Sequence, residues 1–88
     1  MAIVAQFKVS GCSAEKYDAV IRELGPGASP PGQIYHISYG SHDNIQVIDV
    51  FDSAQALENF GKTLAPILAK HGITAEPQVN EVYKIITP

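Results

Sequence analysis

The chain has 88 residues, of which 45% are hydrophobic and 17% are charged, and these values are typical of one small globular domain. The formal net charge is −3 and lysine and arginine do not cluster, so we expect neither a nucleic-acid partner nor a membrane surface. Cys12 is the only cysteine, which excludes an internal disulfide and a four-cysteine iron–sulfur cluster. No apolar stretch approaches the ~20 residues that span a bilayer. The first residues lack the basic region and cleavage site of a signal peptide, so we expect a cytoplasmic protein.

The first part of the chain predicts a strand followed by a helix. Residues 3–9 alternate, and one face of this strand is apolar. Ser13 is a good N-cap residue, and Gly25 followed by a proline is a typical helix end. The apolar stripe of this helix consists of Tyr17, Val20, Ile21 and Leu24. Residues 25–32, GPGASPPG, form a stiff loop that lacks the ending of a phosphate-binding loop.

A β-hairpin is predicted next, with strands over residues 33–40 and 45–51 and a turn over residues 41–44. This turn places His36 opposite Asp49, on the same face of the sheet.

The last part predicts a long helix and a fourth strand. The helix is capped by Asp52 or Ser53, and Pro66 predicts a kink or a restart within it. Its buried stripe consists of Leu57, Phe60, Leu64, Ile67 and Leu68. The fourth strand is predicted over residues 78–86.

The element order is therefore β-α-β-β-α-β. With right-handed crossovers this order gives an α+β, ferredoxin-like fold, in which a four-stranded antiparallel sheet carries both helices on one face. The first and third strands lie centrally, and the whole chain forms one domain, residues 1–88.

The alternation of the hairpin divides its side chains between two faces. One set, which is the more apolar and is expected to lie beneath the helices, is Tyr35, Ile37, Tyr39, Gln46, Ile48 and Val50. The other set, expected on the open face, is Ile34, His36, Ser38, Val47, Asp49 and Phe51. The apolar members of the second set would be exposed in a monomer. Since a chain this small buries only ~60–65% of its unfolded surface, we expect a homodimer that covers this face.

The chain also resembles the dimeric α/β barrel superfamily, which includes small antibiotic-biosynthesis-type monooxygenases and stress-responsive barrel proteins. The resemblance lies in the element order and length, the segment VIDVFDS at 47–53, and Pro66 within the second helix. Many relatives have a tryptophan where Phe51 stands, and this chain has no tryptophan. The resemblance implies a dimer that pairs two sheets into a barrel. It does not select a reaction, because the superfamily includes oxygenases, isomerases and haem enzymes.

His36 and Asp49 are the candidate catalytic pair. A carboxylate beside an imidazole fixes its tautomer and stabilises its protonated form, which suits acid–base catalysis in a cavity. A cross-strand polar pair within the dimer interface is the alternative interpretation. The candidate ligand-binding residues are Ile34, Val47, Phe51, Gln6 and Tyr83. We expect no cofactor, and no metal site, because the three histidines occur in no metal-binding spacing.

These observations leave two functional hypotheses open. The first is a homodimer that binds a small, mostly apolar molecule in a sheet-face cavity and acts as a cofactor-independent monooxygenase or isomerase. The second is a non-catalytic ligand-binding or oligomerisation module. An RNA-recognition domain shares the element order but needs aromatic and basic residues on its central strands. The segment IQVIDVF at 45–51 contains an aspartate and no basic residue, which argues against RNA binding.

Overall fold

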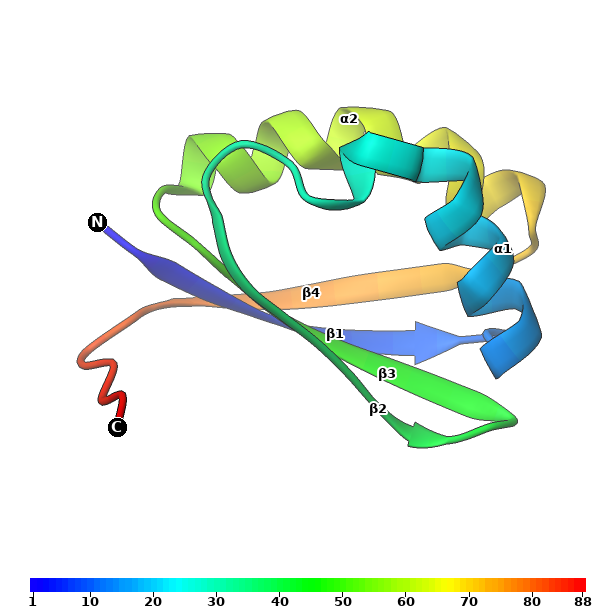
Figure 1. The fold of residues 1–88 in the computed structure, drawn as a ribbon, viewed down its shortest axis with the longest axis horizontal. Helices are drawn as coiled ribbons and strands as arrows, with labels where there is room; N and C mark the ends of the chain where they lie inside the picture. Colours follow the sequence, from blue (N-terminus) through cyan, green and yellow to red (C-terminus); the bar gives the residue numbers. More distant parts are fainter.

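The computed structural model describes residues 1–88, and in it a four-stranded antiparallel sheet carries both long helices on one face (Figure 1). The elements are β1 (Ile3–Ser10), α1 (Ala14–Leu24), a short 3₁₀ helix η1 (Gly25–Ala28), β2 (Gln33–Ser41), β3 (Asn44–Phe51), α2 (Ala54–Lys70) and β4 (Thr74–Glu81). The strand order is β2-β3-β1-β4, so β1 and β3 are central. The predicted α+β, ferredoxin-like fold is confirmed.

Serine residues cap both helices. The Oγ atom of Ser13 accepts a hydrogen bond from the backbone N–H of Lys16 at 3.2 Å, which satisfies one of the free donors at the start of α1. At α2 the Oγ atom of Ser53 accepts from the backbone N–H of Ala56 at 3.1 Å. Ser53 rather than Asp52 is therefore the cap of the second helix.

Helix α2 continues through Pro66 as one element, so the predicted restart is wrong. A proline inside a helix removes one backbone donor and usually breaks or kinks the helix. Here apolar side chains before and after the proline pack against the same core cluster, namely Leu64, Ile67 and Leu68. This burial holds both halves of the helix over the sheet despite the missing hydrogen bond.

The hairpin register agrees with the sequence prediction: His36 pairs with Asp49, and Ser41 pairs with Asn44 across the turn. An irregularity lies between Gln33 and Tyr35, where a β-bulge makes Ile34 the extra residue. The bulge turns Gln33 to the same face of the sheet as Asp49 and leaves the Ile34 side chain exposed.

The predicted assignment of the two hairpin faces is wrong. Phe51 and Asp49 are buried beneath the helices, whereas Ile37, on the other face, is 53% exposed. The physical reason is the register of the central strands, in which Ile3 pairs with Phe51 and Ala5 with Asp49. Directly paired residues share a face, and the apolar face of β1 is buried against the helices.

One end of the ladder between the central strands is completed by a side chain. The backbone pairing of β1 with β3 ends at Phe7 and Val47. Beyond it, the side-chain amide of Gln46 donates to the carbonyl of Val9 and accepts from the N–H of Val9, both at 2.9 Å. Gln46 thus supplies the two hydrogen bonds that a backbone neighbour would otherwise make to Val9.

β4 begins four residues earlier than predicted and ends at Glu81 instead of residue 86. It pairs with β1 along the whole length of that strand, from Ser10 opposite Thr74 to Ile3 opposite Glu81. One further backbone hydrogen bond, from the N–H of Val82 to the carbonyl of Ala2 at 3.0 Å, follows the last pair, and the residues after it leave the sheet (Figure 1). No helix of the structure is long and apolar enough to cross a bilayer.

Candidate active site

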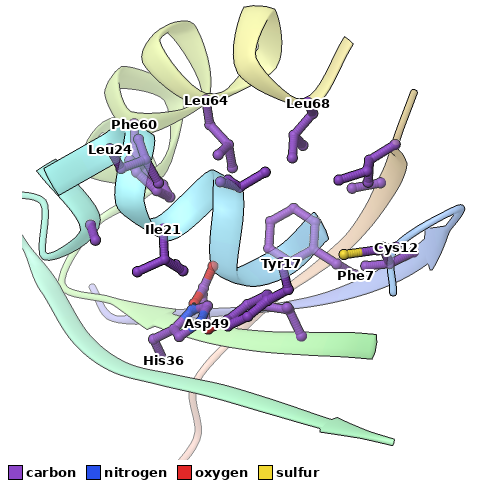
Figure 2. Close-up of a pocket in the computed structure, with 16 residues that line it drawn as sticks. Phe7, Cys12, Tyr17, Ile21, Leu24, His36, Asp49, Phe60, Leu64 and Leu68 are labelled. Atoms are coloured by element: carbon purple, nitrogen blue, oxygen red, sulfur yellow. Dashed lines mark hydrogen bonds and ion pairs between the residues drawn. The ribbon is translucent and has the colours of Figure 1, made fainter. Parts of the chain in front are cut away.

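An apolar cavity lies between the helices and the sheet (Figure 2). Sixteen residues line it, and fourteen of them are hydrophobic. The space open to the centre of a water molecule is about 70 Å³, several times the ~10–15 Å³ that one water requires on this measure. The two remaining lining residues are His36 and Asp49. The only residues of the lining that are not hydrophobic are therefore the pair that the hairpin register brings together.

The pair is directly hydrogen-bonded. Nδ1 of His36 lies 2.5 Å from Oδ1 of Asp49, with β2 supplying the histidine and β3 the carboxylate. The Asp49 side chain is 3% exposed and the His36 side chain 28% exposed. The carboxylate is thus enclosed, while the imidazole lies on the edge strand with one side open to solvent. An ionised carboxylate can only accept, so Nδ1 carries the proton in this bond.

The β-bulge adds a second donor to the same carboxylate. Nε2 of Gln33 lies 3.4 Å from Oδ1 of Asp49, the atom that also accepts from His36. Without the bulge, alternation would turn Gln33 to the open face of the sheet. No buried side-chain nitrogen or oxygen in the structure lacks a hydrogen-bond partner, so this acidic group is accommodated in an apolar setting.

Tyr17 on α1 completes the cluster. Its hydroxyl lies 2.7 Å from Nε2 of His36, and the two rings stack with centroids 6.0 Å apart and planes 12° apart. Since Nδ1 is the donor to Asp49, Nε2 of the neutral imidazole accepts and the phenol donates. The result is a chain of three side chains, Tyr17–His36–Asp49, at the sheet side of the cavity (Figure 2).

Sequence reasoning placed Tyr17 in the helix–sheet core and did not include it in the site. Its position on the apolar stripe of α1 was a usable signal, because that stripe faces the sheet. The sequence prediction placed His36 on the face of the sheet without helices, so a contact between His36 and Tyr17 of α1 was not expected.

The other sequence-predicted ligand residues are dispersed. Val47 lines the cavity. Phe51 is fully buried and packs against Phe60, which lines the cavity, with ring centroids 6.0 Å apart. Ile34 is exposed in the bulge, and Tyr83 is 99% exposed beyond the end of β4.

Gln6 lies on the opposite face of the sheet, where it borders a shallow polar depression. The structure therefore brings His36, Asp49 and Val47 to one cavity and leaves Gln6, Ile34 and Tyr83 away from it.

Cys12 also lines the cavity, just before α1. Burial raises the pKa of its thiol, and the nearby charge of Lys16 offsets part of this effect. The thiolate is the nucleophilic form of cysteine, so this environment suppresses nucleophilic chemistry at Cys12. No three His, Cys, Asp or Glu side chains gather closely enough to hold a metal ion.

Known proteins match this chain by three-dimensional structure and not by sequence search. No known family profile matches the chain, and no curated protein matches its sequence. SnoaB from Streptomyces nogalater, a cofactor-independent oxygenase, superposes with a TM-score of 0.63 at 19% identity, over 99% of this chain and 96% of that chain.

Two further solved structures have similar folds. A protein from Deinococcus radiodurans, assigned as an antibiotic biosynthesis monooxygenase, gives a TM-score of 0.68 at 11% identity, over 100% of this chain and 98% of that chain. A protein from Chloroflexus aurantiacus with the same assignment gives a TM-score of 0.63 at 15% identity, over 98% of this chain and 95% of that chain. The chain therefore has the fold of the antibiotic-biosynthesis-monooxygenase-like proteins, and the resemblance seen in its sequence is confirmed at the level of the fold.

Proposed function

We propose that this protein binds a small, mostly apolar molecule in the cavity between its helices and its sheet, and that it acts as a cofactor-independent monooxygenase or isomerase. The observation that carries the proposal is the composition of the cavity, in which a single histidine–carboxylate pair faces otherwise hydrophobic side chains. An apolar pocket with a few convergent polar groups is the usual form of a small-molecule site. The proposed cavity lies beneath the helices, and not on the open sheet face that the sequence predicted.

The proposed chemistry begins with removal of a proton from the ligand by His36. Asp49 holds the imidazole in the tautomer that leaves Nε2 as the acceptor, and it stabilises the imidazolium that forms. The anion of a conjugated ligand can add dioxygen at the CH₂ carbon that lost the proton and take that proton back from His36, giving a hydroperoxide that loses water and leaves a carbonyl group. Alternatively, the anion can be reprotonated at another carbon. The first route is an oxygenation and the second an isomerisation, and neither requires a protein-bound cofactor. SnoaB, which shares the fold, is a cofactor-independent oxygenase and supports this reading.

Two measurements test the proposal. Toluene, followed by NMR, should shift the methyl resonances of Ile21, Leu64 and Leu68, which line the cavity. Phenylacetone, a small carbon acid, should exchange its benzylic protons in D₂O faster with the protein than without it. A general base contributes about 10²–10⁴-fold, so His36→Ala should slow this exchange by at least about 100-fold.

The control is His42→Ala, because His42 lies in the exposed hairpin turn, away from the cavity. Equal exchange rates in the two variants would remove His36 from the chemistry. Absence of any toluene-induced shift in the cavity would remove the binding site itself.

The homodimer is also part of this proposal, with a different set of residues from the one the sequence suggested. The open face of β2 exposes Tyr35, Ile37 and Tyr39, and this apolar surface lies on the side of the sheet that no helix covers (Figure 1). A second copy packed on this face would bury it. Ile37→Glu should convert the dimer to a monomer in sedimentation equilibrium, and a wild-type chain that is monomeric at high concentration would refute the dimer.

The exposed patch is also the observation that favours the alternative function, a non-catalytic ligand-binding or oligomerisation module. That alternative predicts a dimer with no acceleration of phenylacetone exchange. A cytoplasmic location completes the proposal, and the buried free thiol of Cys12 agrees with a reducing compartment.

A further inference from the structure

Both nitrogen atoms of the candidate base are already occupied. Nδ1 of His36 donates to Asp49, and Nε2 accepts from the hydroxyl of Tyr17 at 2.7 Å. The carboxylate of Asp49 is 3% exposed and accepts from two donors, so it offers a ligand no direct access. A ligand that needs the acceptor on His36 must therefore take the place of the Tyr17 hydroxyl.

Several contacts fix Tyr17 in this position. The start of α1 is tied to the hairpin turn, where the N–H of Ala14 donates to the carbonyl of His42 at 2.7 Å. The N–H of Tyr17 donates to the carbonyl of Ser13 at 2.9 Å, in the first turn of the helix. The stacked rings restrain the side chain further. The bond from Tyr17 to His36 is also the only side-chain hydrogen bond that joins α1 to β2.

We propose that Tyr17 is the specificity-determining residue of this cavity, because its phenol hydroxyl and the donor group of the ligand compete for one acceptor, Nε2 of His36. The inference rests on the proposed binding function and adds a selection rule to it. A ligand without a donor leaves the Tyr17–His36 bond in place when it binds and gains only apolar contacts, so removal of a proton from its carbon requires that bond to open. A ligand with an O–H or N–H exchanges one hydrogen bond for another, so it gains from its donor only if that donor is stronger than a tyrosine phenol. No covalent bond changes in this exchange.

The test compares two probes of nearly equal shape, phenol and toluene, which differ by a hydroxyl in place of a methyl group. Their dissociation constants are measured by NMR titration for the wild type, Tyr17→Phe and Tyr35→Phe. Tyr17→Phe keeps the ring and its stacking but removes the competing hydroxyl. Tyr35→Phe is the matched control, because Tyr35 lies next to His36 in the chain but on the open face of the sheet.

The expected result is an increase in the preference for phenol over toluene in Tyr17→Phe of about 3- to 10-fold, the range of one net hydrogen bond. Tyr35→Phe should leave the preference unchanged. In Tyr17→Phe, phenol should also move the ¹⁵N resonance of His36 Nε2 toward its wild-type position, because it restores a donor to that atom. This second readout depends on the hydrogen bond and not on packing.

An unchanged preference in Tyr17→Phe would refute the competition. A reduced preference would also refute it, because it would mean that the ligand binds the tyrosine hydroxyl itself. In both cases toluene binding survives and the proposed function stands. If neither probe binds any of the three proteins, the proposed cavity function fails, and this inference fails with it.

Discussion

Phe51→Ala provides the sharpest test of which face of the sheet is buried. Phe51 has no exposed surface and packs against Phe60 beneath α2. Truncation of a buried phenylalanine to alanine costs about 3–5 kcal/mol, because apolar contacts are lost and a cavity remains. Native domains have about 0.05–0.15 kcal/mol of stability per residue, or about 4–13 kcal/mol for 88 residues. The substitution should therefore remove about a quarter or more of the free energy of unfolding.

The assay is urea unfolding followed by circular dichroism at two protein concentrations that differ about 50-fold. The loss in Phe51→Ala should be the same at both concentrations, because the Phe51 side chain lies inside one chain. Ile37→Ala is the matched control on the open face, and its cost should be small for a separate chain and should depend on concentration if the chains dimerise. Phe51→Leu, with a smaller loss, serves as the second variant if Phe51→Ala does not fold. A cost below about 1 kcal/mol for Phe51→Ala, or one that changes with concentration, would refute the face assignment.

Three further predictions concern titratable groups. Asp49→Ala should lower the free energy of unfolding by about 2–3 kcal/mol in urea titrations, and Asp49→Asn by clearly less, because the amide oxygen still accepts from His36; equal losses would contradict this. The hydrogen bond from Lys70, with a smaller contribution from His71, lowers the pKa of Glu23. A lowered pKa in the folded state gives stability that is complete above the ordinary glutamate pKa and is lost as the pH falls through the folded value, so Glu23→Gln should flatten the acid side of the stability–pH curve. Burial, opposed in part by Lys16, raises the pKa of Cys12, so its thiol should react with iodoacetamide more slowly than a free cysteine at pH 8 and at the ordinary rate in urea.

The hairpin register could be predicted from the sequence, because alternation and turn length leave few pairings. His36 opposite Asp49 follows from the turn at residues 41–44 and is found in the structure. The bulge at Ile34 could not be predicted, because an extra residue in a strand leaves no distinct pattern in a single sequence. The bulge matters for the candidate site, because it gives the carboxylate of Asp49 a second hydrogen-bond donor, the side-chain amide of Gln33.

The face assignment failed for a physical reason. The prediction compared the two hairpin faces by hydrophobicity, and the set with Tyr35 and Ile37 is the more apolar. The structure buries the set with Asp49 because its polar atoms satisfy one another, so burial costs little. The apolar face of β1 held the missing information. A register that placed Ala5 opposite Asp49 would have assigned the buried face correctly.

The fourth strand shows a different limit. Its predicted range followed local β-propensity, which continues to Ile86. A strand extends only where it has a partner, and after the pair of Ile3 with Glu81 only one backbone hydrogen bond remains, from Val82 to Ala2. Strand length is therefore a property of the pair and cannot be read from one segment.

The amide of Gln46 gives the sheet a movable hydrogen-bonding partner at the end that borders the cavity. Val9 and Val47 both line the cavity, and the backbone pairing between their strands ends at Phe7, two residues before Val9. A backbone group can leave a ladder only if the strand moves, whereas a glutamine side chain leaves by rotation about its own bonds. The two hydrogen bonds from Gln46 to Val9 can therefore break while every backbone pair from Ile3 to Phe7 remains formed. Beyond Val9 the two segments stay joined, because the backbone N–H of Ile45 donates to the carbonyl of Cys12 at 2.8 Å, so rotation of this one side chain would open only a local gap in the sheet.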